Sequence, residues 1–435
     1  MKHLEWLEQL DPVAVHGRIA QAAGIVLEGY GPATSIGELC EVSREDGSTP
    51  LMAEVVGFRG ERIVLMPLGD MRGVGPGSRL TMKGRPACAP VGPKLLGRVI
   101  DGLGRPLDDK GPIEADASYP LYQAPLNPLE RTRISNPLDV GIRVINALLT
   151  CGVGQKIGIF AGAGVGKSIL LGMLSRNTVT DVSVIALIGE RGREVKEFLE
   201  RDLRPDSLQR TVVVVATSDQ PPLVRLRGAF LATAIAEYFR DQNRQVLLLM
   251  DSLTRFAQGQ REVGLAIGEP PTTKGYPPSV FALLPRLLER VGTCAGAGTL
   301  TGIYTILVEG DDLADPIADS ARSILDGHIV LSRDLAARNH YPAIDVLQST
   351  SRVMRSVIAP AHDVAARSVI EMLATYQRAE DLITVGAYHP GINPKLDRAV
   401  NAIDNIHAFL KQEKEERASF PASIEALLKL VEGAR

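Results

Sequence analysis

The sequence has few of the features that would place it outside the ordinary globular proteins. Its four cysteines lie far apart, without a CxxC pair or metal-ligand spacing, so neither a disulfide framework nor a zinc module is expected. They are expected to be buried thiols in a reducing compartment. The longest apolar runs, such as residues 212–216 and 246–250, have the length of strands and are too short to span a bilayer.

The net charge and the aromatic content are also low. Lys and Arg number 48 against 51 Asp and Glu, and aromatic residues make up 4%. Channels that bind single-stranded nucleic acid combine basic side chains with stacking rings, so a ring-shaped nucleic-acid translocase is disfavoured. Glu5 and Glu8 stand where a signal peptide would have its apolar core. We expect a cytoplasmic protein that reaches a membrane only through a partner.

The first part of the chain has an all-β pattern after a short start. Leu4, Leu7 and Leu10 predict an amphipathic helix within residues 1–16, which either caps its own domain or docks a partner. A β-barrel domain is predicted over residues 17–92, because short β-prone runs alternate with Gly, Pro, Asp and Ser. These runs are residues 18–20, 24–27, 38–42, 53–58, 62–66 and 78–82.

Turn signals predict a structured connector over residues 95–136, and from residue 140 onward strands and helices alternate. Strand candidates are residues 157–160, 182–188, 212–216, 246–250, 304–308 and 328–331. Helical periodicity between them predicts an α/β domain over residues 93–360, with a mainly parallel sheet covered on both faces. A C-terminal helical domain is predicted over residues 361–435. The charged run at 411–417 is expected to be a solvated helix end.

Residues 161–168, with the sequence AGAGVGKS, are the most informative segment. They lie between an apolar strand and a helix-like run, as a phosphate-binding loop requires. Backbone N–H groups and the helix N-terminus would converge on phosphates, Lys167 would reach the β- and γ-phosphates, and Ser168 would ligate Mg²⁺. Ala161 replaces the first glycine but still permits the turn. The predicted nucleotide-binding residues are Gly162, Ala163, Gly164, Val165, Gly166, Lys167, Ser168 and Ile169.

Carboxylates follow two of the predicted strands. Asp251 ends the run 245–250 and is placed to hold the Mg²⁺ shell through water, although a helix N-cap is the alternative. Glu190 and Glu194 follow the strand at 182–188, where a carboxylate would orient the attacking water. Both remain candidates from position alone, with Glu190 favoured.

Two residues beyond the sheet are weaker candidates. Arg352 would stabilise transferring phosphoryl charge in its own site or in a neighbour's. Tyr341 would stack on a base or belong to the core.

Long blocks of the chain resemble the rotary-type ATPase subunits related to the catalytic β subunit of ATP synthase, and most closely the flagellar type III protein-export ATPases. The blocks are LGRVIDGLGRPL (96–107), GIFAGAGVGKS (158–168), IGERGREVK (188–196), MDSLTRF (250–256), GEPPTTKGYPPSVF (268–281), EGDD (309–312), DPIADSARSILDGHIVL (315–331) and GAY (386–388). GVGKS, TKGYPPS and DPIADS favour the flagellar branch over the injectisome branch, which is the same-fold alternative.

The resemblance implies a β-barrel, a RecA-like P-loop domain and a C-terminal helical domain, assembled as a homo-hexameric ring that hydrolyses ATP to ADP and phosphate with Mg²⁺. It implies that Glu190 activates water, Arg191 supports the phosphate network and Tyr341 packs on adenine. It also implies that Arg352 reaches the neighbouring subunit's site. A non-catalytic ring subunit is the alternative, against which Glu190 argues.

The partners that the resemblance implies are a stator-like regulator, a central stalk-like export protein, the export gate and chaperone–substrate complexes. No nucleic acid is expected, and membrane association is expected to be peripheral, at the cytoplasmic face of the inner membrane. Two departures stand out. Residues 391–397 lack the acidic loop of the ATP synthase β subunit, and the extension before Gly17, where the regulator would dock, is short.

Overall fold

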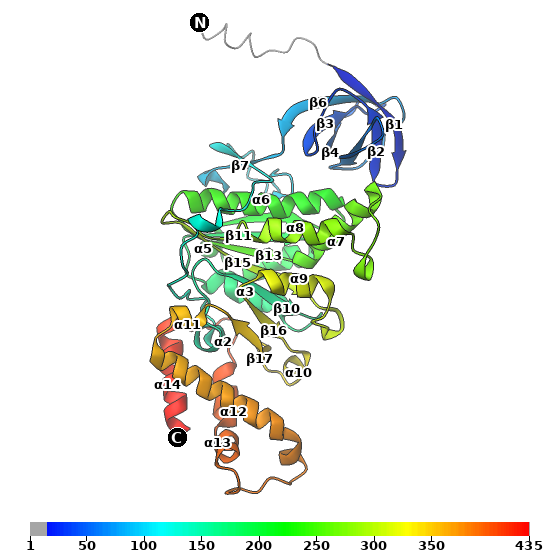
Figure 1. The fold of residues 1–435 in the computed structure, drawn as a ribbon. Coiled ribbons are helices and arrows are strands. Elements are labelled where there is room, and N and C mark those ends of the chain that lie inside the picture. Colours follow the sequence, from blue (N-terminus) through cyan, green and yellow to red (C-terminus); the bar gives the residue numbers. More distant parts are fainter. Residues whose placement is uncertain (1–14, 435) are drawn as a thin grey trace.

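The first strands close into a barrel in the order β1-β2-β5-β4-β3-β6, drawn in blue in Figure 1. The computed structural model describes residues 15–434. Ile19, Leu27, Val55, Leu65 and Leu80 fill the barrel interior. The strands are β1 His16–Ala23, β2 Val26–Tyr30, β3 Glu38–Val42, β4 Leu51–Arg59, β5 Arg62–Pro67 and β6 Arg79–Pro86. The predicted barrel is confirmed, while the helix predicted around Leu4, Leu7 and Leu10 lies outside the described residues.

The central part is built on one sheet with the order β17-β16-β10-β15-β13-β11-β12-β8. Neighbours in this order are parallel, except that β17 runs antiparallel to β16, and β14 pairs antiparallel with β15. The strands are β8 Val99–Asp101, β10 Lys156–Ala161, β11 Val182–Ile188, β12 Thr211–Ala216, β13 Gln245–Asp251, β14 Gly292–Thr293, β15 Thr299–Leu307, β16 Gly327–Leu331 and β17 Ile344–Ser351. The predicted connector thus supplies an edge strand, β8. A separate ribbon pairs β7 (Cys88–Val91) with β9 (Ala117–Pro120).

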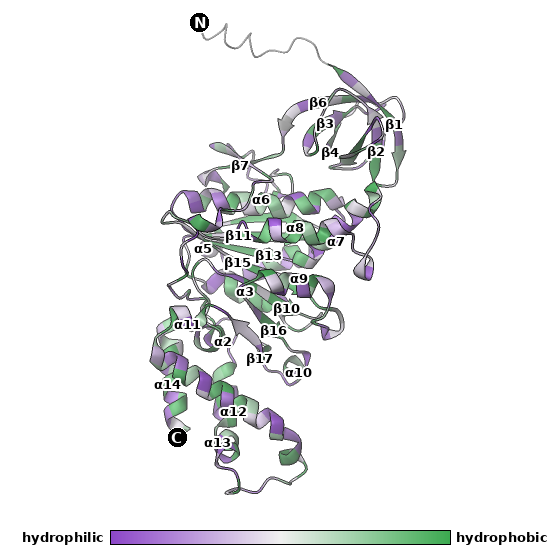
Figure 2. Ribbon diagram, in the orientation of Figure 1, coloured by the Kyte–Doolittle hydropathy of each residue, from purple (hydrophilic) through white to green (hydrophobic). Residues whose placement is uncertain are grey.

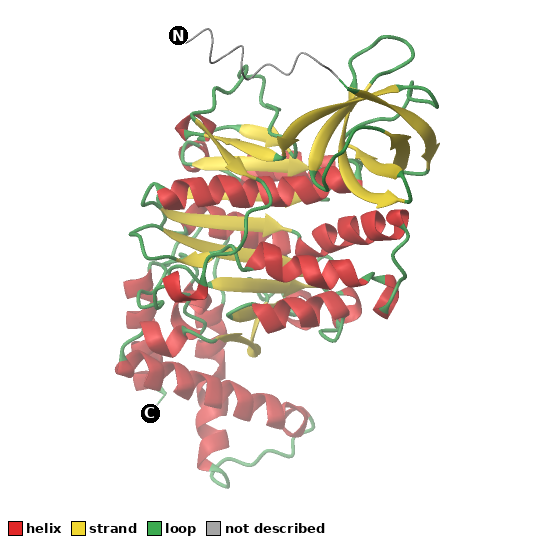
Figure 3. Cartoon of the chain, turned by 45° about the horizontal axis from the view of Figure 1, so that its top comes forward, coloured by secondary structure: helices red, strands yellow, loops and turns green. Residues whose placement is uncertain are grey.

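Alternation along the buried strands creates two hydrophobic cores, one on each face of the sheet. In β11, Val184 and Ala186 face one core, and Ile185 and Leu187 face the other. The strands therefore appear as continuous hydrophobic runs, as expected for a parallel sheet that is covered on both sides. Figure 2 shows this hydrophobic character along the strands and α6, and Figure 3 shows the helices on both sides of the sheet.

Helices of the central part cover the two faces in different ways. Helix α6 is buried over nearly its whole length, whereas α3 packs on the opposite face beside the C-terminal helices. The helices are α2 Arg143–Leu148, α3 Lys167–Asn177, α4 Gly192–Glu197, α5 Pro205–Leu208, α6 Pro222–Asp241, α7 Leu253–Ile267, α8 Pro278–Leu288, α9 Pro316–Ile324 and α10 Arg333–Ala337. Single turns are η1 Pro93–Leu95, η2 Pro128–Glu130, η3 Phe198–Asp202, η4 Thr273–Gly275 and η5 Glu309–Asp311.

The C-terminal part is helical, as predicted. It consists of α11 Met354–Val357, α12 Pro360–Thr384, α13 Pro394–Leu410 and α14 Phe420–Gly433. Its apolar side chains join the core of α3, so this part packs directly against the face of the sheet that carries the phosphate-binding loop's helix. Within residues 15–434, no helix combines the length and the apolar character needed to cross a membrane.

Candidate active site

The glycine-rich segment forms the turn between β10 and α3. Gly164 and Gly166 have φ angles of 77° and 90°, which L side chains rarely adopt. At Gly162 an added Cβ would lie 2.5 Å from Oδ1 of Asp311, so a side chain there would have to displace the Asp311 carboxylate. Ala161 is the last residue of β10 and is paired on both sides, with Leu307 and Leu331. The missing first glycine therefore has no structural cost, because position 161 belongs to a strand.

Lys167, the first residue of α3, lies between two carboxylates. Its Nζ is 2.6 Å from Oδ1 of Asp251 and 3.4 Å from Oε1 of Glu190, and all three side chains are largely buried. Burial alone would lower the pKa of Lys167, but the negative charges of Asp251 and Glu190 outweigh it and raise this pKa. The ammonium group is therefore positively charged at neutral pH.

The parallel sheet brings these groups together. β10, β11 and β13 all end at the same edge, and Leu187 of β11 is in register with Asp251, the last residue of β13. Glu190 follows β11 by two residues. A small cavity of about 80 Å³ at this edge is lined by Ser168, Glu190, Glu194 and Asp251 together with Leu171, Leu187, Val195, Glu197, Phe198 and Asp202. The predicted acids Glu190, Glu194 and Asp251 therefore lie together at one edge of the sheet, as expected from their positions after the strands.

Burial and the nearby charge of Asp251 raise the pKa of Glu190 to about 7, against the opposing effect of Lys167. A carboxyl group with this pKa can accept a proton near neutral pH. Glu194 lies one turn away in α4 and lines the same cavity. Arg191 pairs with Glu194 at 3.6 Å, and its side chain is 76% exposed. Glu190 is the better buried of the two acids, with a side-chain exposure of 13% against 37%.

A second cavity adjoins the loop. Its volume is about 310 Å³, and Gly166, Ile169 and Tyr341 form part of its wall. A Cβ on Gly166 would lie 3.2 Å from Cε1 of Tyr341, so the tyrosine ring packs against the loop. Of the other loop residues, Val165 is buried, whereas Ala163, Gly164, Ser168 and Ile169 are exposed.

The charged segment 411–414 also lines this cavity. Gln412 is buried, its backbone N–H donates to the carbonyl of Tyr341 at 2.9 Å, and its side chain bonds to Gly141 and Arg143. The charged residues of the run 411–417 are exposed or half-buried and directly follow α13, which confirms the predicted solvated helix end, but the burial of Gln412 was not predicted. No local sequence pattern indicates the burial of Gln412, because its hydrogen bonds join residues about 70 and 270 positions apart in the chain.

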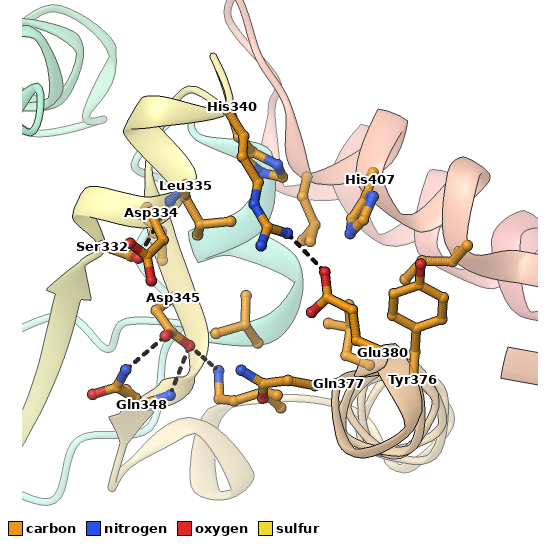
Figure 4. Close-up of a pocket in the computed structure, with 17 residues that line it drawn as sticks. Ser332, Asp334, Leu335, His340, Asp345, Gln348, Tyr376, Gln377, Glu380 and His407 are labelled. Atoms are coloured by element: carbon orange, nitrogen blue, oxygen red, sulfur yellow. Dashed lines mark hydrogen bonds and ion pairs between the residues drawn. The ribbon is translucent and has the colours of Figure 1, made fainter. Parts of the chain in front are cut away.

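On the far side of the Tyr341 segment lies a cleft of about 280 Å³ between the sheet and helices α12 and α13 (Figure 4). His340 is buried there, with its ring edge-on to His407 at a centroid distance of 5.9 Å. Burial lowers the pKa of His340 to about 4, so the imidazole is neutral at physiological pH. Arg338 and Glu380 both line the cleft and form an ion pair of 2.9 Å. This cleft contains none of the predicted site residues.

Arg352 lies apart from the other candidates. Because β17 is antiparallel to β16, Ser351 pairs with Gly327, the first residue of β16. The phosphate-binding loop instead follows the last residue of β10, which is parallel to β16. Arg352 is exposed, and its guanidinium donates to the carbonyl of Arg322 at 3.2 Å. Arg352 thus lies at one edge of the sheet, and the phosphate-binding loop of the same chain lies at the other edge.

Three family models match the chain in order. They are the "ATP synthase alpha/beta family, beta-barrel domain" over residues 19–84, the "ATP synthase alpha/beta family, nucleotide-binding domain" over 141–351 and the "T3SS EscN ATPase C-terminal domain" over 358–429. A flagellum-specific ATP synthase of Salmonella typhimurium is 51% identical, covering 96% of this chain and 94% of that protein. A type 3 secretion system ATPase of Xanthomonas euvesicatoria is 48% identical, covering 96% and 95%.

Solved structures agree with these relatives. The assembled ATPase EscN of the enteropathogenic E. coli type III secretion system matches with a TM-score of 0.91 and 46% identity, over 95% of this chain and all of that one. EscN in complex with its central stalk EscO matches with a TM-score of 0.88 and 45% identity, with the same coverage. The predicted fold class, family and ATPase class are thereby confirmed. The chain belongs to the ATP synthase alpha/beta family, in the branch that contains the flagellum-specific ATP synthases and the type III secretion ATPases.

Proposed function

We propose that this chain is the ATPase of a flagellar type III export apparatus and hydrolyses ATP to ADP and phosphate. The observation that carries the proposal is the position of Lys167, held at the start of α3 between Glu190 and Asp251. Phosphoryl transfer to water needs a cation, a buried acid of raised pKa and a second acid, all close to a phosphate-binding loop. The identity to flagellum-specific relatives favours the flagellar branch over the injectisome branch.

The triphosphate would lie across the turn between β10 and α3. Backbone N–H groups of residues 162–168 and the N-terminus of α3 would bind its oxygens, and Lys167 would turn toward the β- and γ-phosphates. The adenine ring would enter the cavity of about 310 Å³, between Tyr341 and the segment 411–414. Ile169, exposed at the mouth of this cavity, would contact the nucleoside.

The residues around the small cavity also suit Mg²⁺. Ser168 and Asp251 offer a hydroxyl and a carboxylate, the hard oxygen ligands that this ion prefers, and both line the same space of about 80 Å³. When bound, the ion would neutralise charge that develops on the phosphate oxygens. Ser168 would be a direct ligand and Asp251 would hold the water shell.

Glu190 would orient the attacking water and draw on its proton, since it is buried at the same edge and its pKa is raised to about 7. Glu194 lines the same cavity but is more exposed and pairs with Arg191, so it is given no part in the reaction. Arg191 would move inward from its exposed position to support the phosphate network.

The site is proposed to be completed between subunits of a ring of six. Arg352 lies at the edge opposite its own loop and is exposed, so it can reach a γ-phosphate only in another chain. There its planar guanidinium would neutralise transferring charge. The likeness over 95% of this chain to EscN in its assembled form supports such a ring.

The partners follow from the same likeness. EscN has been solved with a central stalk, and we propose an equivalent stalk-like export protein for this chain. A stator-like regulator, the export gate and chaperone–substrate complexes complete the proposed set, with association at the cytoplasmic face of the inner membrane being peripheral.

The direct test is phosphate release from Mg-ATP by the full chain, compared between two amide variants. Glu190→Gln keeps the shape of the side chain and loses the carboxylate, so it should bind Mg-ATP and lose turnover by about 10²–10⁴-fold. Glu194→Gln, the matched control, should retain most of the turnover. Normal turnover in Glu190→Gln with a dead Glu194→Gln would assign the role to the other acid.

A further inference from the structure

A buried threonine lies next to Asp251, on the strand between β10 and β13. β15 runs between β10 and β13, and Thr305 of β15 is in register with Ile159 of β10. Its side chain is fully buried, and its hydroxyl donates a hydrogen bond of 2.6 Å to Oδ1 of Asp251. Asp251 therefore has two partners on the same oxygen, the hydroxyl of Thr305 and the ammonium of Lys167.

These two partners differ in how far they can move. Lys167 has a long flexible side chain, and within the proposed function its ammonium turns toward the nucleotide phosphates. Thr305 is β-branched, lies on a central strand and has stiff side-chain torsions, so it cannot follow. When Lys167 exchanges Asp251 for a phosphate, Thr305 is the partner that stays.

We propose that Thr305 is a positioning residue, which holds the carboxylate of Asp251 in one rotamer while Lys167 changes partners. The inference rests on the proposed role of Asp251 in the Mg²⁺ shell. Both hydrogen bonds fall on Oδ1, and Asp251 lines the cavity where Ser168 and Glu190 also lie, so a fixed rotamer would keep Oδ2 available to a metal ion's water shell there. A hydroxyl donor to a carboxylate at this distance is a strong, charge-assisted bond, and residues that orient metal-site groups have large effects on metal affinity.

The test is the Mg²⁺ dependence of nucleotide binding in Thr305→Val, which keeps the shape and removes the hydroxyl. With a fluorescent ATP analogue, the Mg²⁺ concentration that gives half-maximal enhancement of binding should rise about tenfold or more. Binding without Mg²⁺ should change by less than about twofold, since the phosphate contacts of the loop remain. Thr305→Ser, which restores the donor, should return the Mg²⁺ dependence close to that of the unmodified chain. Thr305→Ala gives a second removal of the donor without added bulk, and the same rise is expected.

Thr301→Val is the matched control. Thr301 lies four residues earlier on β15, is equally buried, and its hydroxyl accepts the N–H of Gly154 at 2.8 Å, away from Asp251. Its replacement should leave the Mg²⁺ dependence unchanged. An unshifted Mg²⁺ dependence in Thr305→Val, or an equal shift in Thr301→Val, overturns the inference.

Asp251→Asn separates this inference from the function on which it rests. A raised Mg²⁺ requirement in Asp251→Asn with none in Thr305→Val rejects only the role of Thr305. If Asp251→Asn itself leaves the Mg²⁺ dependence unchanged, the assignment of Asp251 to the Mg²⁺ shell is wrong, and the inference fails with it.

Discussion

A cation lies at each of the two edges where the strands of the central sheet end, and the two cations differ in burial and in partners. At the carboxyl ends of β10, β11 and β13, Lys167 is largely buried between Asp251 and Glu190. At the amino-terminal end of β16, Arg352 is exposed and contacts only a backbone carbonyl through its guanidinium, within the part of the chain that the structure describes. The first edge holds a cation and two acids together, whereas the second leaves its cation exposed. Under the proposed function the two edges are complementary halves of a site, which a ring of subunits would join.

The largest effect is expected from Lys167→Ala. This change removes the only cation between Glu190 and Asp251 in the described structure, so charge on the transferring phosphoryl group is no longer stabilised. Phosphate release should fall by more than about 10³-fold while the protein still folds. Lys196→Ala, at an exposed lysine that pairs with Glu200 at 3.7 Å, serves as the control and should keep its activity. Turnover in Lys167→Ala within tenfold of the unmodified chain would remove the phosphate-loop assignment.

Arg352→Ala tests the other edge and should come next in size. The isolated chain should bind nucleotide with nearly unchanged affinity, because Arg352 lies far from its own loop. The rise of specific activity with protein concentration should disappear, a loss of about 10³-fold in the assembled ring. Arg355→Ala removes a nearby exposed arginine that pairs with Asp363, and it should preserve the rise.

Mixing the two variants sharpens the comparison between the edges. In a mixed ring, the intact loop of an Arg352→Ala chain can meet Arg352 of a Lys167→Ala chain, so partial activity should return. No recovery in rings shown to be mixed would count heavily against action in trans. Specific activity that is independent of protein concentration would show that the ring is not required.

The two edges were not equally accessible to sequence analysis. The loop edge was predictable because its signals are local: a strand, a glycine-rich turn, a helix, and acids at the ends of apolar runs. The barrel was predictable for the same reason, from short runs with regular punctuation. The position of Arg352 was not, because it depends on the antiparallel direction of β17, which no local pattern encodes.

Long-range packing explains the other omissions. Residues 99–101 appeared to belong to a connector, yet they pair with β12 as the edge strand β8. Gln412 looked like part of a solvated charged run, although its bonds tie the C-terminal helices to Tyr341. Thr305 is indistinguishable in sequence from any buried strand residue, and only the packing of β15 beside β13 reveals its bond to Asp251.

A smaller effect is expected from pH. In the proposed reaction Glu190 acts in its ionised form, and burial with the charge of Asp251 raises its pKa to about 7. The value of kcat/KM should therefore rise with pH through about 7 and level off above it, falling about tenfold per unit on the acid side. Steady-state rates from about pH 5.5 to 8.5 provide the measurement. A flat profile across this range would mean that Glu190 does not act as the base in the free enzyme.

The smallest expected effect is on the thermal stability of the nucleotide-free chain. It tests the raised pKa of Glu190 independently of any role in catalysis. Its pKa of about 7 in the folded state lies above the ordinary value of 4.5, so the folded chain binds this proton more tightly than the unfolded chain. The stability that the protonated group contributes is fully present below pH 4.5 and is lost as the pH rises through 7. Glu190→Gln cannot ionise and escapes this loss. At pH 5 the two proteins should melt at similar temperatures, whereas at pH 8 the amide variant should be more stable by on the order of 2 kcal/mol, or about 2–4 °C.

Glu197→Gln, at a partly exposed acid that pairs with Arg193 at 2.7 Å, is the control and should not reproduce the pH-dependent gain. A melting difference that stays constant between pH 5 and 8 would contradict the raised pKa of Glu190, and with it the burial beside Asp251 that distinguishes the loop edge from the edge of Arg352.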